Sequence, residues 1–276
     1  MQFVKHYFRS PVAVFGLLLL LAIIAMALAA DWLYPKNPLG LAGRPLQWPS
    51  LSGKFLMGTD ASGRDIAAQI VHGARTTLIM ALSSTLIAIA IGIVIGAIAG
   101  FYGGWIDNAL MRITEAFQTL PSFILLLVLV LVMGSSMQSV TIVIGIVSWP
   151  AVARLTRAEF LSLRSREFIQ ACRTIGLRDG WIIFREILPN GLAPIIVYGS
   201  VVMAMSILLE SSLAFLELSD PNVPSWGNLI GHGRKVLRSE WYVSAIPGIA
   251  ILLTILAVSL VGQGVNDALN PRLRRR

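Results

Sequence analysis

The residue types that carry most enzyme chemistry are scarce in this chain. There is one cysteine, Cys172, and the three histidines, His6, His72 and His232, lie far apart. A single thiol leaves no partner for a disulfide, and dispersed histidines form no metal motif, so no metal is expected. The sequence has no G-x4-G-K-[ST] phosphate loop and no spacing typical of a Ser, His and Asp triad. We therefore predict that the chain is not an enzyme and has no catalytic residue or cofactor of its own.

The most unusual charge pattern lies in the range 154–189, where seven arginines interrupt the apolar runs. Phe168, Cys172 and Ile175 recur at spacings of four and three, which predicts one apolar face of a helix. Gly176 stands where such a helix would end in a left-handed cap.

A second short helix is expected from Gly180 to Leu188, with Asp179 as its cap. Trp181, Phe184 and Leu188 would share one face of it. Pro189 then marks the start of the next apolar run. The pattern predicts two helices that meet at a sharp angle beside a membrane.

Two interpretations of this hairpin remain open on the residues alone. It could brace the membrane helices as an interfacial amphipathic hairpin, or it could dock another protein. Alternating acids and bases, such as Glu159, Glu167 and Arg185-Glu186, favour docking, because a lipid-facing helix would be more uniformly basic.

The composition indicates an integral membrane protein. Of 276 residues 56% are hydrophobic and only 13% are charged, whereas a soluble domain is nearer a quarter charged. A helix needs about 20 apolar residues to cross the hydrocarbon. We expect an all-α, polytopic protein with six spans, roughly 11–31, 78–101, 117–134, 139–156, 191–213 and 244–265. The first span resembles a signal peptide, but we expect it to be retained.

Lysine and arginine predict the orientation. If the N-terminus is cytosolic, the inside segments contain Lys5, Arg9, Arg112, the seven arginines of 154–189 and four arginines of the C-terminal tail. The outside segments contain fewer. Both termini are therefore expected in the cytosol, and the net charge of +8 is explained by topology rather than by nucleic-acid binding.

The chain divides into two parts in this prediction. Residues 1–75 comprise the N-terminal tip, the first span and an outside segment rich in Pro, Gly and Trp. Residues 76–276 comprise a five-helix core with a cytosolic loop at about 154–190. Span two carries Gly92, Gly96, Ala97 and Gly100, small residues that allow another helix to approach closely, from this chain or from a partner.

At this point the sequence resembles a known family. Residues 170–189, QACRTIGLRDGWIIFREILP, resemble the "EAA" loop of ABC-importer permeases, E-A-A-x3-G-x9-I-x-L-P. Glutamine replaces the first Glu, cysteine replaces the second Ala, and Glu186 takes the place of Ile. The spacing from Gly176 to Pro189 is intact.

Further motifs resemble the dipeptide, oligopeptide and nickel permeases, specifically their "C" type with one helix before the core. They are GTDASGRD at 58–65 with GAR at 73–75, ESSLAFL at 210–216, PSWG at 224–227 and GQGVNDALNP at 262–271. Glu217 stands where that family usually has Gly, so the local turn there is expected to differ.

The resemblance implies a type I ABC-importer permease fold and a coupling helix at about 167–176 that seats in a cytosolic ATPase. The coupling residues it implies are Glu167, Gln170, Ala171, Cys172, Arg173, Gly176, Leu177 and Pro189. The implied partners are a homologous second permease, two ATP-binding subunits that hold ATP and Mg²⁺, and an extracytoplasmic solute-binding protein. Peptides or related small solutes, including nickel chelates, would move into the cytoplasm by alternating access, across a prokaryotic inner membrane.

Several residues outside the loop are candidates for other roles. Glu210 lies near the outer end of span five, and an ionisable residue in a span is a functional candidate; with Met203 and Ser206 it could belong to the translocation path or outer gate. Asp60, Arg64 and Asp65 form either a local turn network or a contact for the binding protein. Trp226 and Trp241 are expected at the membrane interface.

Two other functional classes compete with an importer subunit. An ATP-independent secondary transporter would need buried ionisable groups near mid-bilayer, and Asp and Glu are absent from the centres of the predicted spans. A membrane scaffold or assembly protein would not require the spacing from Gly176 to Pro189.

Overall fold

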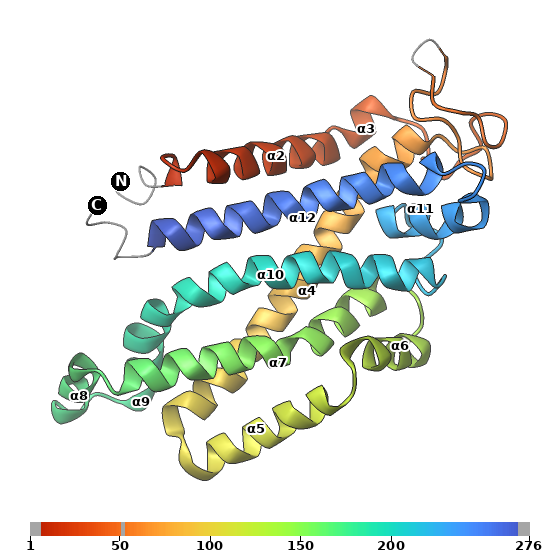
Figure 1. The fold of residues 1–276 in the computed structure, drawn as a ribbon. Helices are drawn as coiled ribbons and strands as arrows, with labels where there is room; N and C mark the ends of the chain where they lie inside the picture. Colours follow the sequence, from red (N-terminus) through yellow and green to blue (C-terminus); the bar gives the residue numbers. More distant parts are fainter. Residues whose placement is uncertain (1–6, 51–52, 270–276) are drawn as a thin grey trace.

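The computed structural model describes residues 7–50 and 53–269. Lys5, His6, Pro271 and the arginines of the C-terminal tail lie outside these residues. The regular secondary structure of the described residues is helical, apart from an isolated bridge between Thr59 and Asp65. Its α-helices are α2 (Pro11–Leu28), α3 (Ala30–Leu33), α4 (Ile66–Tyr102), α5 (Gly104–Thr119), α6 (Ser122–Met133), α7 (Met137–Arg164), α8 (Glu167–Thr174), α9 (Asp179–Trp181), α10 (Leu188–Phe215), α11 (Trp226–Gly233) and α12 (Tyr242–Leu269) (Figure 1).

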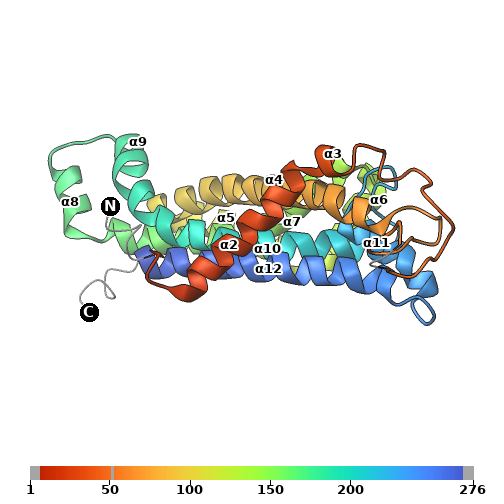
Figure 2. The same cartoon turned by 90° about the horizontal axis from the view of Figure 1, so that it is seen from above.

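The long helices run side by side in an elongated bundle, and the connections gather at its two ends. One end carries α8 and α9, and the opposite end carries α3, α6 and α11, as both views show (Figures 1 and 2). Five helical stretches are long and apolar enough to cross a membrane, and the number rises to six if the bent pair α5 and α6 is counted as one span. The predicted six spans agree with the structure when that pair is counted as one.

The third span, predicted as one helix over 117–134, is wrong. α5 and α6 meet at 85°, and the break falls at Leu120 and Pro121. Proline forces the preceding residue out of the helical region, and Leu120 has φ −86° and ψ 135°. Counted as one span, the pair includes the polar helix α5, which carries Asp107, Arg112 and Glu115. The predicted span 117–134 left these three residues outside.

Other helix ends extend beyond the prediction. α4 begins at Ile66 rather than 78, and α7 ends at Arg164 rather than 156, so Arg154 and Arg157 lie on a membrane helix and not in a loop. The segment Asp179–Phe215 runs as one span. Pro189 does not interrupt it, because a π-helical turn, Ile182–Ile187, precedes the proline and replaces the usual i→i−4 bonds.

The small residues of α4 pack against another helix of this chain rather than against a partner, which were the two possibilities the sequence allowed. A Cβ on Gly92 would lie 2.5 Å from Cβ of Val152 on α7, and one on Gly96 would lie 2.4 Å from the carbonyl oxygen of Ala153. Gly100 approaches Phe160 in the same way. Glycine at four-residue spacing thus allows α4 and α7 to make the most extensive helix contact in the described chain.

The first helix is packed closely onto the last. A Cβ on Gly16 of α2 would lie 2.5 Å from Cβ of Leu260 on α12, and Gly264 of α12 approaches Ala13. Residue 75, where the prediction divided the chain, lies inside α4. The division itself stays a prediction.

Candidate coupling segment and membrane path

Helix α8 ends in the hydrogen-bond pattern of a Schellman cap. Gly176 has φ +77°, the left-handed conformation predicted for it. Its N–H donates to the carbonyl of Arg173 at 3.0 Å, and the N–H of Leu177 donates to the carbonyl of Cys172 at 3.1 Å. Four of the implied coupling residues thus build the turn that reverses the chain after α8.

The face of α8 that packs on the protein is not the predicted one. Ile169 is fully buried against Phe160, Ile182 and Ile187, with Cys172 and Leu177 packed partly against the same cluster. Phe168 is 41% exposed and Ile175 is 74% exposed. The predicted face over Phe168, Cys172 and Ile175 is therefore wrong, because two of its three members point outward.

In the second half of the hairpin, too, the buried face is not the predicted one. Ile182 and Ile187 are the buried side chains, whereas Phe184 is 69% exposed and Trp181 is also exposed. The cap of this helix is Arg178 rather than Asp179, which is the first helical residue. The hairpin therefore presents apolar groups on its outer side.

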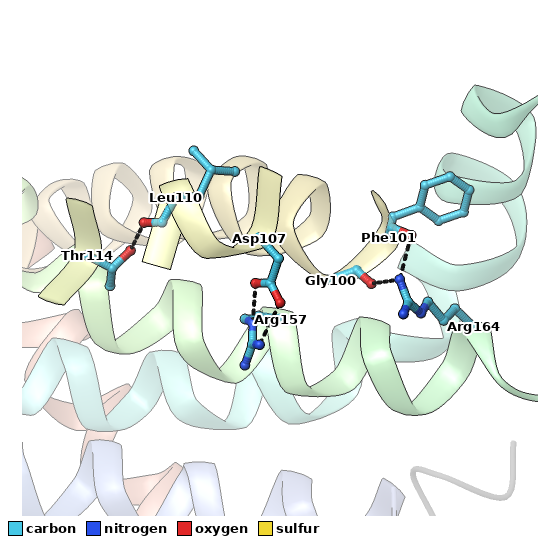
Figure 3. A network of polar contacts seen from close by, with 7 residues as sticks. All are labelled: Gly100, Phe101, Asp107, Leu110, Thr114, Arg157 and Arg164. Atoms are coloured by element: carbon cyan, nitrogen blue, oxygen red, sulfur yellow. Dashed lines mark hydrogen bonds and ion pairs between the residues drawn. The ribbon is translucent and has the colours of Figure 1, made fainter. Parts of the chain in front are cut away.

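Gln170 and Arg164 connect α8 to the ends of α7 and α4. The Gln170 side-chain amide donates to the carbonyl of Arg164 at 3.2 Å, a bond that glutamate at this position could not donate. The Arg164 guanidinium donates to the carbonyls of Gly100 and Phe101 at 3.2 and 3.0 Å (Figure 3). The guanidinium of Arg173 lies 5.3 Å from the centre of the Phe101 ring.

The remaining implied residues flank this core. Glu167 is the first residue of α8, where a carboxylate interacts favourably with the helix dipole. Ala171 is exposed on the outer side of α8, and Pro189 lies in the first turn of α10.

An ion pair between α5 and α7 was missed by the sequence analysis. Asp107 accepts two hydrogen bonds from Arg157, at 2.5 Å from Nε and 2.6 Å from Nη2 (Figure 3). The Asp107 side chain is 11% exposed. Arg157 and Arg164 are seven residues apart, which places them two turns apart on one helix face. That spacing was the one sign in the sequence that the two arginines act on the same side of α7. The partner of Arg157 lies 50 residues away, which no local pattern reveals.

A cavity of about 250 Å³ opens between α5, α6, α7 and α10, at the break between α5 and α6. Phe117, which lines it, meets Trp149 edge to face at 5.3 Å between ring centres. The lining consists of Phe117, Gln118, Ser122, Val147, Ser148, Pro150, Ala151, Tyr198, Val201, Val202, Met205 and Leu209. These side chains are apolar or neutral polar.

The three predicted path residues of α10 lie away from this cavity. Met203 packs partly against a hydrophobic cluster that includes Ile70 and Trp226. Ser206 is buried and donates to the carbonyl of Val202. Glu210 is 2% exposed, and its Oε1 accepts a hydrogen bond of 2.8 Å from Ser225. The structure brings Met205 to the cavity instead.

Ser225 also caps α11 through the N–H of Asn228, so Glu210 fixes the start of α11 on α10. Gly227 lies directly against the carboxylate, since a Cβ there would be 2.9 Å from Oε2. Trp226 is fully buried, with its indole N–H donating to the carbonyl of Ile70. Because it is buried within the chain, Trp226 is not an exposed anchor in lipid as expected, whereas Trp241 is 56% exposed.

The segment before α4 is held by its acidic residues. Asp60 is buried and accepts from the N–H groups of Ser62 and Arg64 and from the amide of Gln69. Asp65 caps α4 by accepting from the N–H of Ala67, and burial raises the pKa of its carboxyl. These bonds confirm a local turn network.

The loop after α10 carries a charged cluster. Glu217 has φ +63°, so a residue other than glycine adopts the left-handed conformation in this turn. Its carboxylate lies 3.0 Å from Nζ of Lys235 and 3.7 Å from Arg234, and the hydrogen bond from Lys235 lowers its pKa. Burial lowers the pKa of nearby His232.

The structure is thus a polytopic helical bundle with a hairpin at one end and a neutral cavity between α5, α6, α7 and α10. The family described as the binding-protein-dependent transport system inner membrane component matches residues 92–275. The chain belongs to this family. The N-terminal transmembrane domain of oligopeptide transport permease C matches residues 1–49.

Curated relatives match over nearly the whole chain. A di/tripeptide transport permease of Pseudomonas aeruginosa is 35% identical, over 99% of this chain and 92% of its own. A glutathione transport permease of Pectobacterium atrosepticum is 36% identical over 99% and 91%. A putative peptide permease of Brucella suis is 38% identical over 97% and 89%.

The fold resembles that of a solved ABC transporter. An inward-facing structure of the MetNI methionine transporter superposes with a TM-score of 0.61 at 19% identity, over 72% of this chain and 95% of that chain. The type I importer fold expected from the sequence is confirmed. The chain is a multi-pass permease subunit.

Proposed function

We propose that this chain is the permease half of an ABC importer that moves peptides, or chemically related small solutes, into the cytoplasm. The α8 end would then face the cytosol together with both termini, and α11 would face outward. The peptide class is supported by the names of the relatives above. Nickel chelates remain a secondary candidate from the sequence resemblance alone.

The observation that carries the proposal is the outward side of α8. Phe168, Ala171 and Ile175 share that side and are exposed at one end of the bundle, while Ile169 anchors the helix from behind. Apolar side chains in solvent at the tip of a rigid hairpin suit a protein partner. That partner would be an ATP-binding subunit, one of two that hold ATP and Mg²⁺.

The cavity between α5, α6, α7 and α10 would form half of the solute path, completed by a homologous second permease. Its neutral lining suits a zwitterionic or uncharged solute, because no single charge sign is favoured. Glu210, with Met203 and Ser206 on the same helix, would position the outer end without touching solute. Arg64 and Asp65 would contact the binding protein, while Asp60 holds their turn.

Reconstitution tests this function. The chain is placed in proteoliposomes with its second permease, ATPase subunits and binding protein, and uptake of a labelled dipeptide panel is measured. We expect uptake that requires both ATP and this chain. Uptake that persists without ATP would indicate a secondary transporter and overturn the proposal.

A further inference from the structure

Helix α5 is held to the rest of the protein by few contacts. Of its 16 residues only Asp107 and Thr114 are buried. The Thr114 hydroxyl bonds within the helix, to the carbonyl of Leu110. Two specific side-chain contacts join α5 to α7: the ion pair of Asp107 with Arg157 at one end and the edge-to-face contact of Phe117 with Trp149 at the other.

The backbone on either side does not fix the orientation of α5. Gly103 precedes it with φ +69° and Gly104 begins it with φ +56°, and Leu120 and Pro121 break the helix after it. Both junctions interrupt the helical hydrogen bonds that would transmit a movement rigidly. The side-chain contacts with α7 therefore help to determine where α5 lies, together with its packing against α4.

The same end of α7 also holds α8. Arg164, two turns after Arg157, binds the end of α4 with its guanidinium and accepts the amide of Gln170 with its carbonyl. Figure 3 shows Arg157 and Arg164 directed from α7 toward α5 and the end of α4. The last turns of α7 thus join the hairpin to α5 through polar contacts.

We propose that the Asp107–Arg157 pair carries movement of α8 and α7 to α5, and so to the cavity wall at Phe117 and Gln118. The inference rests on the proposed function, because it assigns a route for the ATPase-driven movement. A bidentate pair suits this role because its two parallel bonds fix direction as well as distance. Apolar contacts alone would allow α5 to slide.

The test measures solute imported per ATP hydrolysed in the reconstituted complex. Asp107→Asn keeps the side-chain shape and removes the charge. We expect assembly and ATP hydrolysis to persist while import per ATP falls by roughly tenfold, as coupling between linked sites allows. The double variant Asp107→Arg with Arg157→Asp is expected to recover part of the lost import per ATP.

A structural role alone would lower the amount of complex and leave import per ATP unchanged. Glu115→Gln is the matched control, since the pair Arg112–Glu115 lies within α5 and links it to nothing else. It is expected to keep the wild-type ratio. An equal fall in import per ATP in this control would overturn the inference, because removing any charge from α5 would then have the same effect.

If Asp107→Asn does not assemble, Arg157→Lys decides instead, because it keeps the charge but loses the bidentate fork. An intermediate ratio is expected. A wild-type ratio in either variant would overturn the inference while leaving the importer assignment intact. Absence of ATP-dependent import by the wild-type complex would overturn the proposed function itself.

Discussion

At the scale of single residues, the candidate coupling segment depends on a left-handed glycine. Gly176 ends α8 with φ +77°, and a Cβ there would meet nothing within 4 Å. Within this chain the position has room for a side chain but disfavours its backbone conformation. A partner seated on the turn would add a steric limit.

Gly176→Leu is expected to uncouple transport before it unfolds the protein. The backbone strain costs about 1–2 kcal/mol, and the side chain would occupy the space of the ATPase. Uptake and ATP hydrolysis by the reconstituted complex are the measurements. Gly134→Leu is the control, since Gly134 has φ +86° and equal free space but caps α6, which lies at the opposite end. Equal loss of uptake in both would show that strain alone is responsible.

His232 is expected to make stability depend on pH. Burial lowers its pKa below the ordinary value of 6.5, so the unfolded chain binds the proton more readily than the folded chain. Stability is then complete above pH 6.5 and decreases as pH falls below it. Thermal unfolding of the purified protein from about pH 8 to about pH 5 should show this loss. The loss should be smaller in His232→Gln; an identical loss in both would contradict the assignment.

At the scale of helices, glycine spacing and proline placement decide the geometry. α4 and α7 approach because Gly92, Gly96 and Gly100 form one stripe. α5 and α6 diverge because Pro121 removes a donor and restricts its neighbour.

Gly96→Val is expected to destabilise the bundle by about 1–3 kcal/mol, the usual range for overpacking. Its Cβ would lie 2.4 Å from the carbonyl oxygen of Ala153, which cannot move without shifting α7. The midpoint of thermal unfolding in detergent measures the effect. Gly248→Ala on α12 meets nothing within 4 Å and should be neutral or stabilising, because alanine favours helix. A neutral Gly96→Val would mean that the two helices do not pack this closely.

At the scale of the whole molecule, the two ends are built differently. The α8 end is a short hairpin anchored by the buried Ile169, and the α11 end is secured by buried polar contacts around Glu210 and Trp226. This asymmetry suits a protein that is driven from one end and opens at the other.

Phe168→Asp is expected to weaken binding of the ATPase subunits by roughly tenfold or more, the size of an interface hot spot. Its ring is exposed on α8, so the fold should tolerate the change. Co-purification of the ATPase with the tagged permease provides the measurement. Leu41→Asp introduces the same charge at the opposite end, at a side chain 82% exposed, and should leave co-purification unchanged. Retention of the ATPase by Phe168→Asp would place its contact elsewhere.

The sequence by itself determined the number of crossings and the cap at Gly176, because apolar length and glycine conformation are local properties. The motifs from Gln170 to Pro189 likewise pointed to the family that the comparisons then showed. Only the tertiary structure decided which side of α8 is buried, since Ile169 and Phe168 are adjacent and equally apolar. It also paired Asp107 with Arg157 and carried one helix through Pro189. Those outcomes depend on neighbours distant in sequence, whose positions no local pattern specifies.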